Sequence, residues 1–259
     1  MAKRNIFVWL VLLGALFAMS GCSWPRISNT NAAGNAFEGP FFTPIKTATP
    51  APTAVPTQTP TPVPTVPPQV LASRLGFIMP VKGAHVPEWL DLVPGAKRGY
   101  RSGTHEGVDF GYNAVGVTVR VGTQVLASGG GVVVRADLNY REPTSQEMDA
   151  ILARSARQGD TSADDLDKLR GRQVWIDHGQ GLVTRYAHLD RTATGITVGT
   201  QVSKGQLIAY VGNSGVPNDG AGDSPHLHFE IRIGDSYLGQ GLTPARARDL
   251  YVQALSGKK

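Results

Sequence analysis

The sequence predicts a mainly β domain that carries a short two-helix insertion. From about residue 73 onward, short runs of alternating apolar residues are separated by Gly, Asn and Asp, which is the pattern of strands joined by turns. Between residues 141 and 170 this pattern gives way to apolar residues at helical spacing. The preceding residues have the composition of an exported leader, over 1–21, followed by a proline-rich spacer, over 22–72.

The overall composition narrows the class of protein. The chain has 259 residues, of which 41% are hydrophobic, so it has enough apolar mass for a folded core. Its 31 glycines follow no triplet period and charged heptads are missing, which excludes collagen-like and coiled-coil chains. The formal charge of +5 would fall by two, to +3, if a leader containing Lys3 and Arg4 were removed. We therefore expect no nucleic-acid partner.

The first 21 residues have the features of a bacterial lipoprotein signal peptide. A basic head precedes an apolar run over 6–18, which is shorter than the roughly 20 residues of a bilayer-spanning helix. The residues MSGC at 19–22 resemble a lipobox, although lipoboxes favour leucine at the position of Met19. We expect an exported protein of the cell envelope, anchored to a membrane through lipidated Cys22. The alternatives are an ordinary signal peptide with an incidental cysteine, or an uncleaved anchor.

Residues 22–72 are predicted to form a tether. Ten of the 18 prolines lie between Pro40 and Pro68, and Lys46 is the only charged residue between Glu38 and Arg74. Proline removes backbone donors and apolar mass is scarce, so this segment cannot build a sheet or a core. An extended spacer of this kind reaches roughly 90 Å, at about 3 Å per residue. We expect it to separate a folded domain, residues 73–259, from the membrane.

Six segments of that domain are predicted to be strands. They are the short apolar runs at 124–126, 131–135, 173–177, 182–188, 206–211 and 226–233. The sequence Val-Gly-Thr-Gln-Val occurs at 121–125 and again at 198–202, each time before a strand. This repeat indicates either convergent turn chemistry or a β-architecture with two quasi-equivalent halves.

Two short helices are predicted within the insertion at residues 141–170. Thr144 with Glu147, and Thr161 with Asp164, have the spacing of a capping box. Apolar residues follow these caps at helical spacing: Met148, Ile151, Leu152, Leu166 and Leu169. We expect the insertion to be a surface elaboration. The alternative is that its helices wall a substrate groove.

Two histidine motifs indicate a metal site. In an extended chain His105, Gly107 and Asp109 share one face, because strand side chains alternate. Histidine and aspartate are zinc ligands, and the glycine between them leaves space where an ion could sit. A helical HExxH motif is rejected because its second histidine would fall at Asp109, and because Gly107 and Val108 disfavour a helix.

The second motif is HxHxE at residues 226–230. The same alternation places His226, His228 and Glu230 on one face of a strand and turns the intervening apolar residues toward the core. Two imidazoles on one strand face are rarely packing residues. Both motifs in one domain therefore favour a shared metal ion. Cys22 is the only cysteine, so a cysteine-based zinc cluster is excluded.

Taken in order, HxGxD at 105–109, Tyr-x-His-Leu at 186–189 and HxHxE at 226–230 resemble the M23 family of peptidases, the lysostaphin-type zinc endopeptidases of bacterial cell walls. The resemblance covers residues 77–244 and implies antiparallel sheets that form an open groove, with Zn²⁺ as cofactor and peptidoglycan as substrate. The sequence departs from the family in the insertion after Asp137 and in a longer loop at 216–224. Subsite preferences therefore cannot be carried over.

The resemblance also implies roles for single residues. His105, Asp109 and His228 would be the zinc ligands. His188 and His226 would act on the metal-bound water and the developing oxyanion, a role that suits imidazoles with an ordinary pKa near ~6.5. Which of the two is the general base stays open.

We therefore expect a zinc-dependent endopeptidase that hydrolyses peptide bonds of peptidoglycan stems or cross-bridges. The alternative is a non-catalytic M23-like scaffold that binds the cell wall or activates a partner hydrolase. Such scaffolds have lost zinc ligands, whereas all five positions are intact here. Five further residues are expected outside the ligand set. His178 would be a structural hydrogen-bonding residue, His85 a loop residue and Glu230 a hydrogen-bond partner near the metal, and Tyr100 with Arg101 would be candidate substrate contacts.

Overall fold

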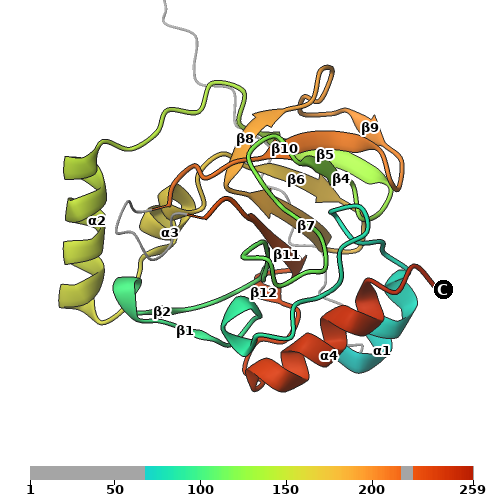
Figure 1. Ribbon diagram of the computed structural model, residues 1–259, viewed down its shortest axis with the longest axis horizontal. Coiled ribbons are helices and arrows are strands. Elements are labelled where there is room, and N and C mark those ends of the chain that lie inside the picture. Colours follow the sequence, from blue (N-terminus) through green and yellow to red (C-terminus); the bar gives the residue numbers. More distant parts are fainter. Residues whose placement is uncertain (1–67, 217–223, 259) are drawn as a thin grey trace, which may run out of the picture. The chain divides into compact units, whose positions relative to one another are not determined.

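Antiparallel strand pairs dominate the computed structural model, which describes residues 68–216 and 224–258 (Figure 1). The predicted signal peptide, Cys22 and nearly all of the predicted tether lie outside the described residues. Helix α1 (Pro68–Leu75) spans the predicted start of the domain at residue 73, and Ala72 is buried in the main core. No helix in the described ranges combines the length and the apolar character that crossing a bilayer requires.

Two sheets make up most of the domain. The larger has the strand order β12 (Ser236–Tyr237), β11 (Leu227–Ile233), β7 (Leu182–Ala187), β6 (Val174–Asp177), β5 (Gly131–Ala136) and β9 (Gln201–Val202), and β3 (Val108–Phe110) also pairs with β11. The smaller has the order β4 (Gln124–Leu126), β10 (Leu207–Val211) and β8 (Leu189–Thr192). Every pairing is antiparallel. The predicted mainly β class and all six predicted strands are confirmed.

The remaining elements are short or lie near the ends of the domain. They are η1 (Leu90–Leu92), the hairpin of β1 (Lys97–Arg98) and β2 (Gly103–Thr104) around η2 (Gly99–Arg101), and α4 (Pro244–Ala254). Helices α1 and α4 pack against each other on one side of the sheets (Figure 1).

The two Val-Gly-Thr-Gln-Val copies form the same structure. Gly122 and Gly199 both have positive φ, 86° and 89°, which glycine adopts without steric cost. Each donates its N–H to the carbonyl of a valine in a central strand, Val211 of β10 or Val133 of β5, at 2.8 Å. That valine donates its own N–H to the carbonyl of the threonine in the same copy. The repeat therefore marks two equivalent turns, one before β4 in the smaller sheet and one before β9 in the larger. Convergent turn chemistry and two quasi-equivalent halves both predict this match.

The apolar face of β11 lies at the centre of the main core. Leu227, Phe229 and Ile231 are fully buried, as the alternation in the sequence predicted. The Phe229 ring packs 5.2 Å from that of Tyr186 on β7 and 6.3 Å from that of Phe110 on β3, between ring centroids. Because this face is held by strands on both edges, the opposite face of β11 presents His228 in a fixed position.

The insertion joins two strands that pair directly with each other, β5 and β6. It contains α2 (Ser145–Gln158) and α3 (Ala163–Leu169), as predicted. The capping box of Thr144 and Glu147 is present at the start of α2. Met148 and Ile151 of α2 pack with Leu169 in a small cluster separate from the main core.

The predicted cap of the second helix is wrong by one residue. Ser162 caps α3 and accepts a hydrogen bond from the N–H of Asp165, at 3.2 Å. Thr161 is buried instead, and its hydroxyl donates to the carbonyl of Arg101. Both registers have capping-box spacing, so the tertiary contact with Arg101 decides between them.

Candidate metal centre

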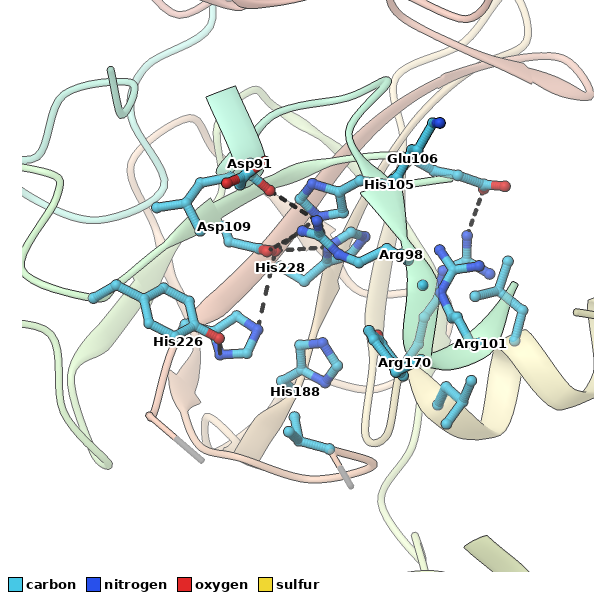
Figure 2. A pocket seen from close by; sticks show the side chains of 18 residues that line it. Asp91, Arg98, Arg101, His105, Glu106, Asp109, Arg170, His188, His226 and His228 are labelled. Atoms are coloured by element: carbon cyan, nitrogen blue, oxygen red, sulfur yellow. Dashed lines mark hydrogen bonds and ion pairs between the residues drawn. The ribbon is translucent and has the colours of Figure 1, made fainter. Parts of the chain in front are cut away.

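Three side chains place one ligand atom each around a common point (Figure 2). Nε2 of His105 lies 2.9 Å from Oδ1 of Asp109 and 3.0 Å from Nδ1 of His228, and this Nδ1 lies 2.9 Å from the same Oδ1. His105 precedes β3, Asp109 lies within β3, and the β3–β11 register pairs Asp109 directly with His228. All three are buried. The three predicted ligands are thus brought together by one strand pair.

Outer hydrogen bonds decide which nitrogen of each ring carries a proton. Nδ1 of His105 lies 3.2 Å from the carbonyl of Val93, and Nε2 of His228 lies 3.0 Å from a carboxylate oxygen of Glu230. A carbonyl and a carboxylate accept, so these nitrogens donate. In the neutral form of each ring, which metal binding requires, the other nitrogen turns its lone pair toward Asp109. Two imidazole lone pairs and a carboxylate oxygen that meet without a donor between them fit a zinc ion.

Burial and charge act in opposite directions on these ligands. Burial lowers the pKa of His105 to about 3, against the attraction of Asp109, so the ring is neutral as a metal ligand requires. At His228 burial also opposes charge, but hydrogen bonds to Asp109 and Glu230 raise its pKa overall. Protons and a metal ion therefore compete for His228.

The second oxygen of the Asp109 carboxylate is held by an arginine. A guanidinium nitrogen of Arg98 donates to Oδ2 at 2.9 Å, and another nitrogen of Arg98 donates to the carbonyl of Asp91 at 2.8 Å. The bond to Asp91 holds the guanidinium in place, and the charge-assisted bond to Oδ2 orients the carboxylate so that Oδ1 faces the histidines. Arg98 was not identified from the sequence, because it lies seven residues before HxGxD and belongs to no motif.

The expected function of Gly107 is corrected by the structure. We expected the glycine to leave space for an ion, but a Cβ at this position would lie 2.8 Å from the His228 ring and 2.5 Å from the Phe229 carbonyl oxygen. The space above Gly107 is therefore filled by β11. Its lack of a side chain lets His228 approach Asp109.

His188 occupies an unusual backbone position beside the predicted ligands. It follows β7 with a φ of 58°, a left-handed conformation that is uncommon for residues other than glycine. Its N–H donates to the carbonyl of Arg170 at 2.9 Å, and its Nδ1 donates to the carbonyl of Ser214 at 2.8 Å. Nε2 is then the nitrogen with a lone pair. The insertion, through Arg170, helps to hold this histidine.

His226 lies on the other side of the same site. Its ring centroid is 4.7 Å from that of His188, and its Nε2 is 4.0 Å from Oδ1 of Asp109. Its Nδ1 donates to the carbonyl of Ser224 at 2.8 Å, with the hydroxyl of Tyr112 3.2 Å away. Both predicted catalytic histidines therefore have Nδ1 anchored and Nε2 available as an acceptor.

Burial changes the acidity that the sequence implied for these two rings. We expected an ordinary pKa near ~6.5, but burial lowers the pKa of His226 below that value. Burial, together with His226 and His228, lowers the pKa of His188 still further. Both rings are neutral at neutral pH and can accept a proton there.

A cavity of about 350 Å³ opens over the site. Its lining includes all five predicted residues, His105, Asp109, His188, His226 and His228. Leu166, Leu169 and Arg170 of the insertion also line it, together with Tyr100 and Arg101. The expectation that the insertion is only a surface elaboration is therefore wrong for α3. Figure 1 shows α2 at the margin of the domain with α3 nearer the sheets.

A buried ion network supports the ligands and was mostly missed from the sequence. Arg170 lies 2.7 Å from both Glu230 and Glu106, and Arg232 lies 2.7 Å from Glu106 and 3.4 Å from Glu230. Glu230, fully buried, accepts from His228 as expected. Arg232 continues the alternation of β11 past Glu230, so the pattern contained a signal for it. Arg170 comes from the insertion and has no such signal.

The other histidines lie away from the metal centre, as predicted. His178 is 2.8 Å from the carbonyl of Gly130 and 2.9 Å from the hydroxyl of Thr184, so it joins two strands. His85 makes a contact of 3.1 Å with the carbonyl of its neighbour Val86.

Removing the charge of Arg170 should destabilise the domain strongly. In Arg170→Met the buried Glu230 loses its closest charged partner, which costs about 3–5 kcal/mol when a buried pair is broken. Urea denaturation of the full chain measures the loss of unfolding free energy. Arg141→Met removes an exposed pair with Glu147 and should leave that free energy close to the wild-type value. A loss below about 1 kcal/mol for Arg170→Met would contradict the proposed support of Glu230.

Comparison with known proteins agrees with this geometry. Residues 103–240 match the model of peptidase family M23, and this range contains all five site residues. The peptidoglycan DD-endopeptidase ShyA of Vibrio cholerae is 30% identical over 133 residues, which are 51% of this chain and 21% of ShyA. ShyC of the same organism, also named a peptidoglycan DD-endopeptidase, is 25% identical over 60% of this chain and 25% of its own length. The chain thus spans about a quarter or less of these relatives.

Solved structures of similar fold include a zinc-containing peptidase from Vibrio cholerae. It has a TM-score of 0.40 and 23% identity, covering 62% of this chain and 38% of its own. A catalytic domain of the prophage-encoded M23 protein EnpA from Enterococcus faecalis has a TM-score of 0.40 and 19% identity, over 65% of this chain and 95% of its own. The family model covers more than half of the 259 residues, including the metal centre, and the chain therefore belongs to peptidase family M23.

Proposed function

We propose that this protein is a zinc-dependent endopeptidase that hydrolyses peptide bonds in peptidoglycan stems or cross-bridges. The observation that carries the proposal is the convergence of two imidazoles and a carboxylate, with two further neutral imidazoles in the same cavity. Family membership supports a peptidase, and the names of ShyA and ShyC support peptidoglycan as the substrate. His105, Asp109 and His228 would hold the metal.

Bound zinc would supply a Lewis acid and lower the pKa of a water toward ~7. The chain's own residues provide the proton transfers. Because Nδ1 of His188 and Nδ1 of His226 both donate to backbone carbonyls, each ring accepts a proton at Nε2 and can pass it to the leaving amine. The same anchors keep the rings from rotating, so the acceptor nitrogens stay at the cavity. The burial of both rings keeps them neutral before the reaction.

Zinc content tests the ligand assignment. The purified full chain should contain about one zinc per molecule, and His228→Ala should lose it because one of three protein ligands is removed. His85→Ala is the matched control, since His85 lies outside the cavity and should leave the zinc content unchanged. Elemental analysis measures all three. Equal zinc in wild type and His228→Ala would refute the assignment.

Catalysis separates the ligands from the two other histidines. His188→Ala and His226→Ala should keep the zinc but lose at least about a hundredfold in rate, because general acid–base catalysis contributes 10²–10⁴-fold. Mass spectrometry of purified peptidoglycan digested with each protein measures the rate and identifies the bond. Burial lowers the pKa values of both His188 and His226. The acid limb of the pH–rate profile of wild type should therefore lie below pH 6.5, the pH at which an ordinary histidine is half protonated.

The outcomes of that digestion separate the two functions weighed from the sequence. Cleavage by wild type and none by His188→Ala supports the endopeptidase. Zinc-loaded wild type that binds peptidoglycan without cleaving it would instead establish the non-catalytic scaffold. Loss of zinc from His188→Ala equal to that of an Asp109→Ala variant would show that His188 is a ligand.

We also propose that the domain is held at a membrane of the cell envelope through lipidated Cys22. The support is the signal-like sequence at 1–21, the MSGC motif and the proline-rich segment that follows. Cys22→Ser should either leave the membrane fraction or accumulate as an unprocessed precursor, because the acceptor thiol is absent. Cell fractionation with immunoblotting measures both. A variant that fractionates and migrates like wild type would rule out lipidation at Cys22.

A further inference from the structure

A second cavity, of about 920 Å³, adjoins the metal cavity. The two share part of their lining, including Arg98, Arg101, Glu106 and Arg170. The second cavity extends past these residues to Trp175 on β6, Arg185 on β7 and Arg232 on β11. The shared residues place the second cavity directly beside the metal cavity.

Guanidinium groups outnumber the carboxylates that pair with them in this cavity. Arg101, Arg170, Arg185 and Arg232 line it. Arg170, Arg185 and Arg232 share two carboxylates, Glu106 at the wall of the cavity and the buried Glu230. Arg170 and Arg232 take the short contacts, at 2.7 Å. Two other charged groups of the lining are paired elsewhere, Arg98 with Asp109 and Asp167 with Arg135. Exposed Asp160 accepts from the N–H of Thr161 and keeps its negative charge at the lining. Exposed Lys97 adds a further positive charge.

Arg185 and Arg101 are the guanidinium groups that exceed the carboxylates available for pairing. The guanidinium of Arg185 meets one carboxylate among the described residues, Glu230 at 3.6 Å, and otherwise stacks on the Trp175 ring at 3.8 Å. Burial, together with the neighbouring Arg232 and Arg170, lowers the pKa of Arg185 to about 10 against the attraction of Glu230 and Glu106. Arg101 has no carboxylate within 4.0 Å in residues 68–216 and 224–258, and donates to the carbonyl of Thr104 at 2.6 Å.

Uncharged groups hold both side chains in place. The Trp175 ring stacks on the guanidinium of Arg185. Gly103 makes room for Arg101, because a Cβ at Gly103 would lie 2.0 Å from the Arg101 guanidinium. A network that served only to orient His228 would need Glu230 with Arg170 and Arg232, and these three already form it. Arg101 and Arg185 add charge that this task does not require.

We propose that this cavity is a subsite for a carboxylate of the peptide substrate, bound by Arg101 and Arg185. The proposal rests on the proposed peptidase function and specifies its substrate as a peptide with a free carboxylate close to the scissile bond. Guanidinium groups bind carboxylates through paired, charge-assisted hydrogen bonds. Arg101 lines both cavities, so a carboxylate here lies next to the residues that act on the bond.

The experiment compares two forms of one probe. Muropeptides from digested peptidoglycan are used as prepared, and after carbodiimide and ammonia have converted their carboxylates to carboxamides. Isothermal titration calorimetry with the full chain measures both dissociation constants. Wild type should prefer the carboxylate form by roughly tenfold or more, the factor that a charge-assisted hydrogen bond of about 1.5 kcal/mol provides.

Variants assign the preference to the two arginines. Arg185→Gln and Arg101→Gln should bring the ratio of the two constants close to one and raise KM more than they lower kcat, with zinc content unchanged. Arg185→Lys keeps a positive charge and should retain part of the preference. Arg157→Gln is the matched control, because Arg157 is exposed on α2 and lines neither cavity. It should behave as wild type.

The outcomes separate this proposal from the proposed function. Wild type that binds both forms equally overturns the subsite without any variant, even if it cleaves peptidoglycan. Arg185→Gln and Arg101→Gln that fold, hold zinc and keep the full preference also overturn it, and would place the carboxylate on the metal. A carboxylate preference that depends on these arginines in a protein that cleaves nothing supports the subsite and refutes the peptidase.

Discussion

The pairing of β11 with β3 and β7 is the constraint on which the site depends. It sets Asp109 opposite His228 and places Phe229 against Tyr186. Strand side chains alternate, so a slip of one residue would send the histidines into the core and the apolar residues into the cavity. The burial of the apolar face therefore fixes the metal centre on the other face. Stability and site geometry come from the same strand.

A cluster of buried polar groups on that face is costly unless each group has a partner. Here the partners are arranged in a chain, from Arg170 to Glu230 to His228 and then to Asp109, whose other oxygen is held by Arg98. Each contact satisfies one buried group and orients the next. The chain explains how two imidazole lone pairs come to face a carboxylate in the protein interior. The arrangement has the ligand types that a zinc ion takes.

The insertion is part of this arrangement, although the sequence favoured a surface elaboration. It connects β5 to β6, and these two strands pair directly with each other. The pairing of the strands therefore does not require the insertion. Its last residues nevertheless contribute the Arg170 side chain to Glu230 and the Arg170 carbonyl to the N–H of His188. Helix α2, in contrast, packs its apolar face in a cluster of its own. The same insertion thus has an outer helix, α2, and an inner helix, α3, that borders the cavity over the candidate metal centre.

Local patterns in the sequence determined the strands, the β class, the first helix cap and the two same-face histidine motifs, because alternation, turn residues and motif spacing act over a few neighbours. The place of His188 beside these motifs was implied by the family resemblance. Tertiary structure alone decided the rest. It moved the second cap to Ser162, filled the space over Gly107 with the His228 ring, and brought Arg98 and Arg170 to the metal centre. These outcomes depend on residues that are distant in the chain and meet only when the sheets pack. Burial, which lowers the pKa of His188, likewise exists only in the folded state.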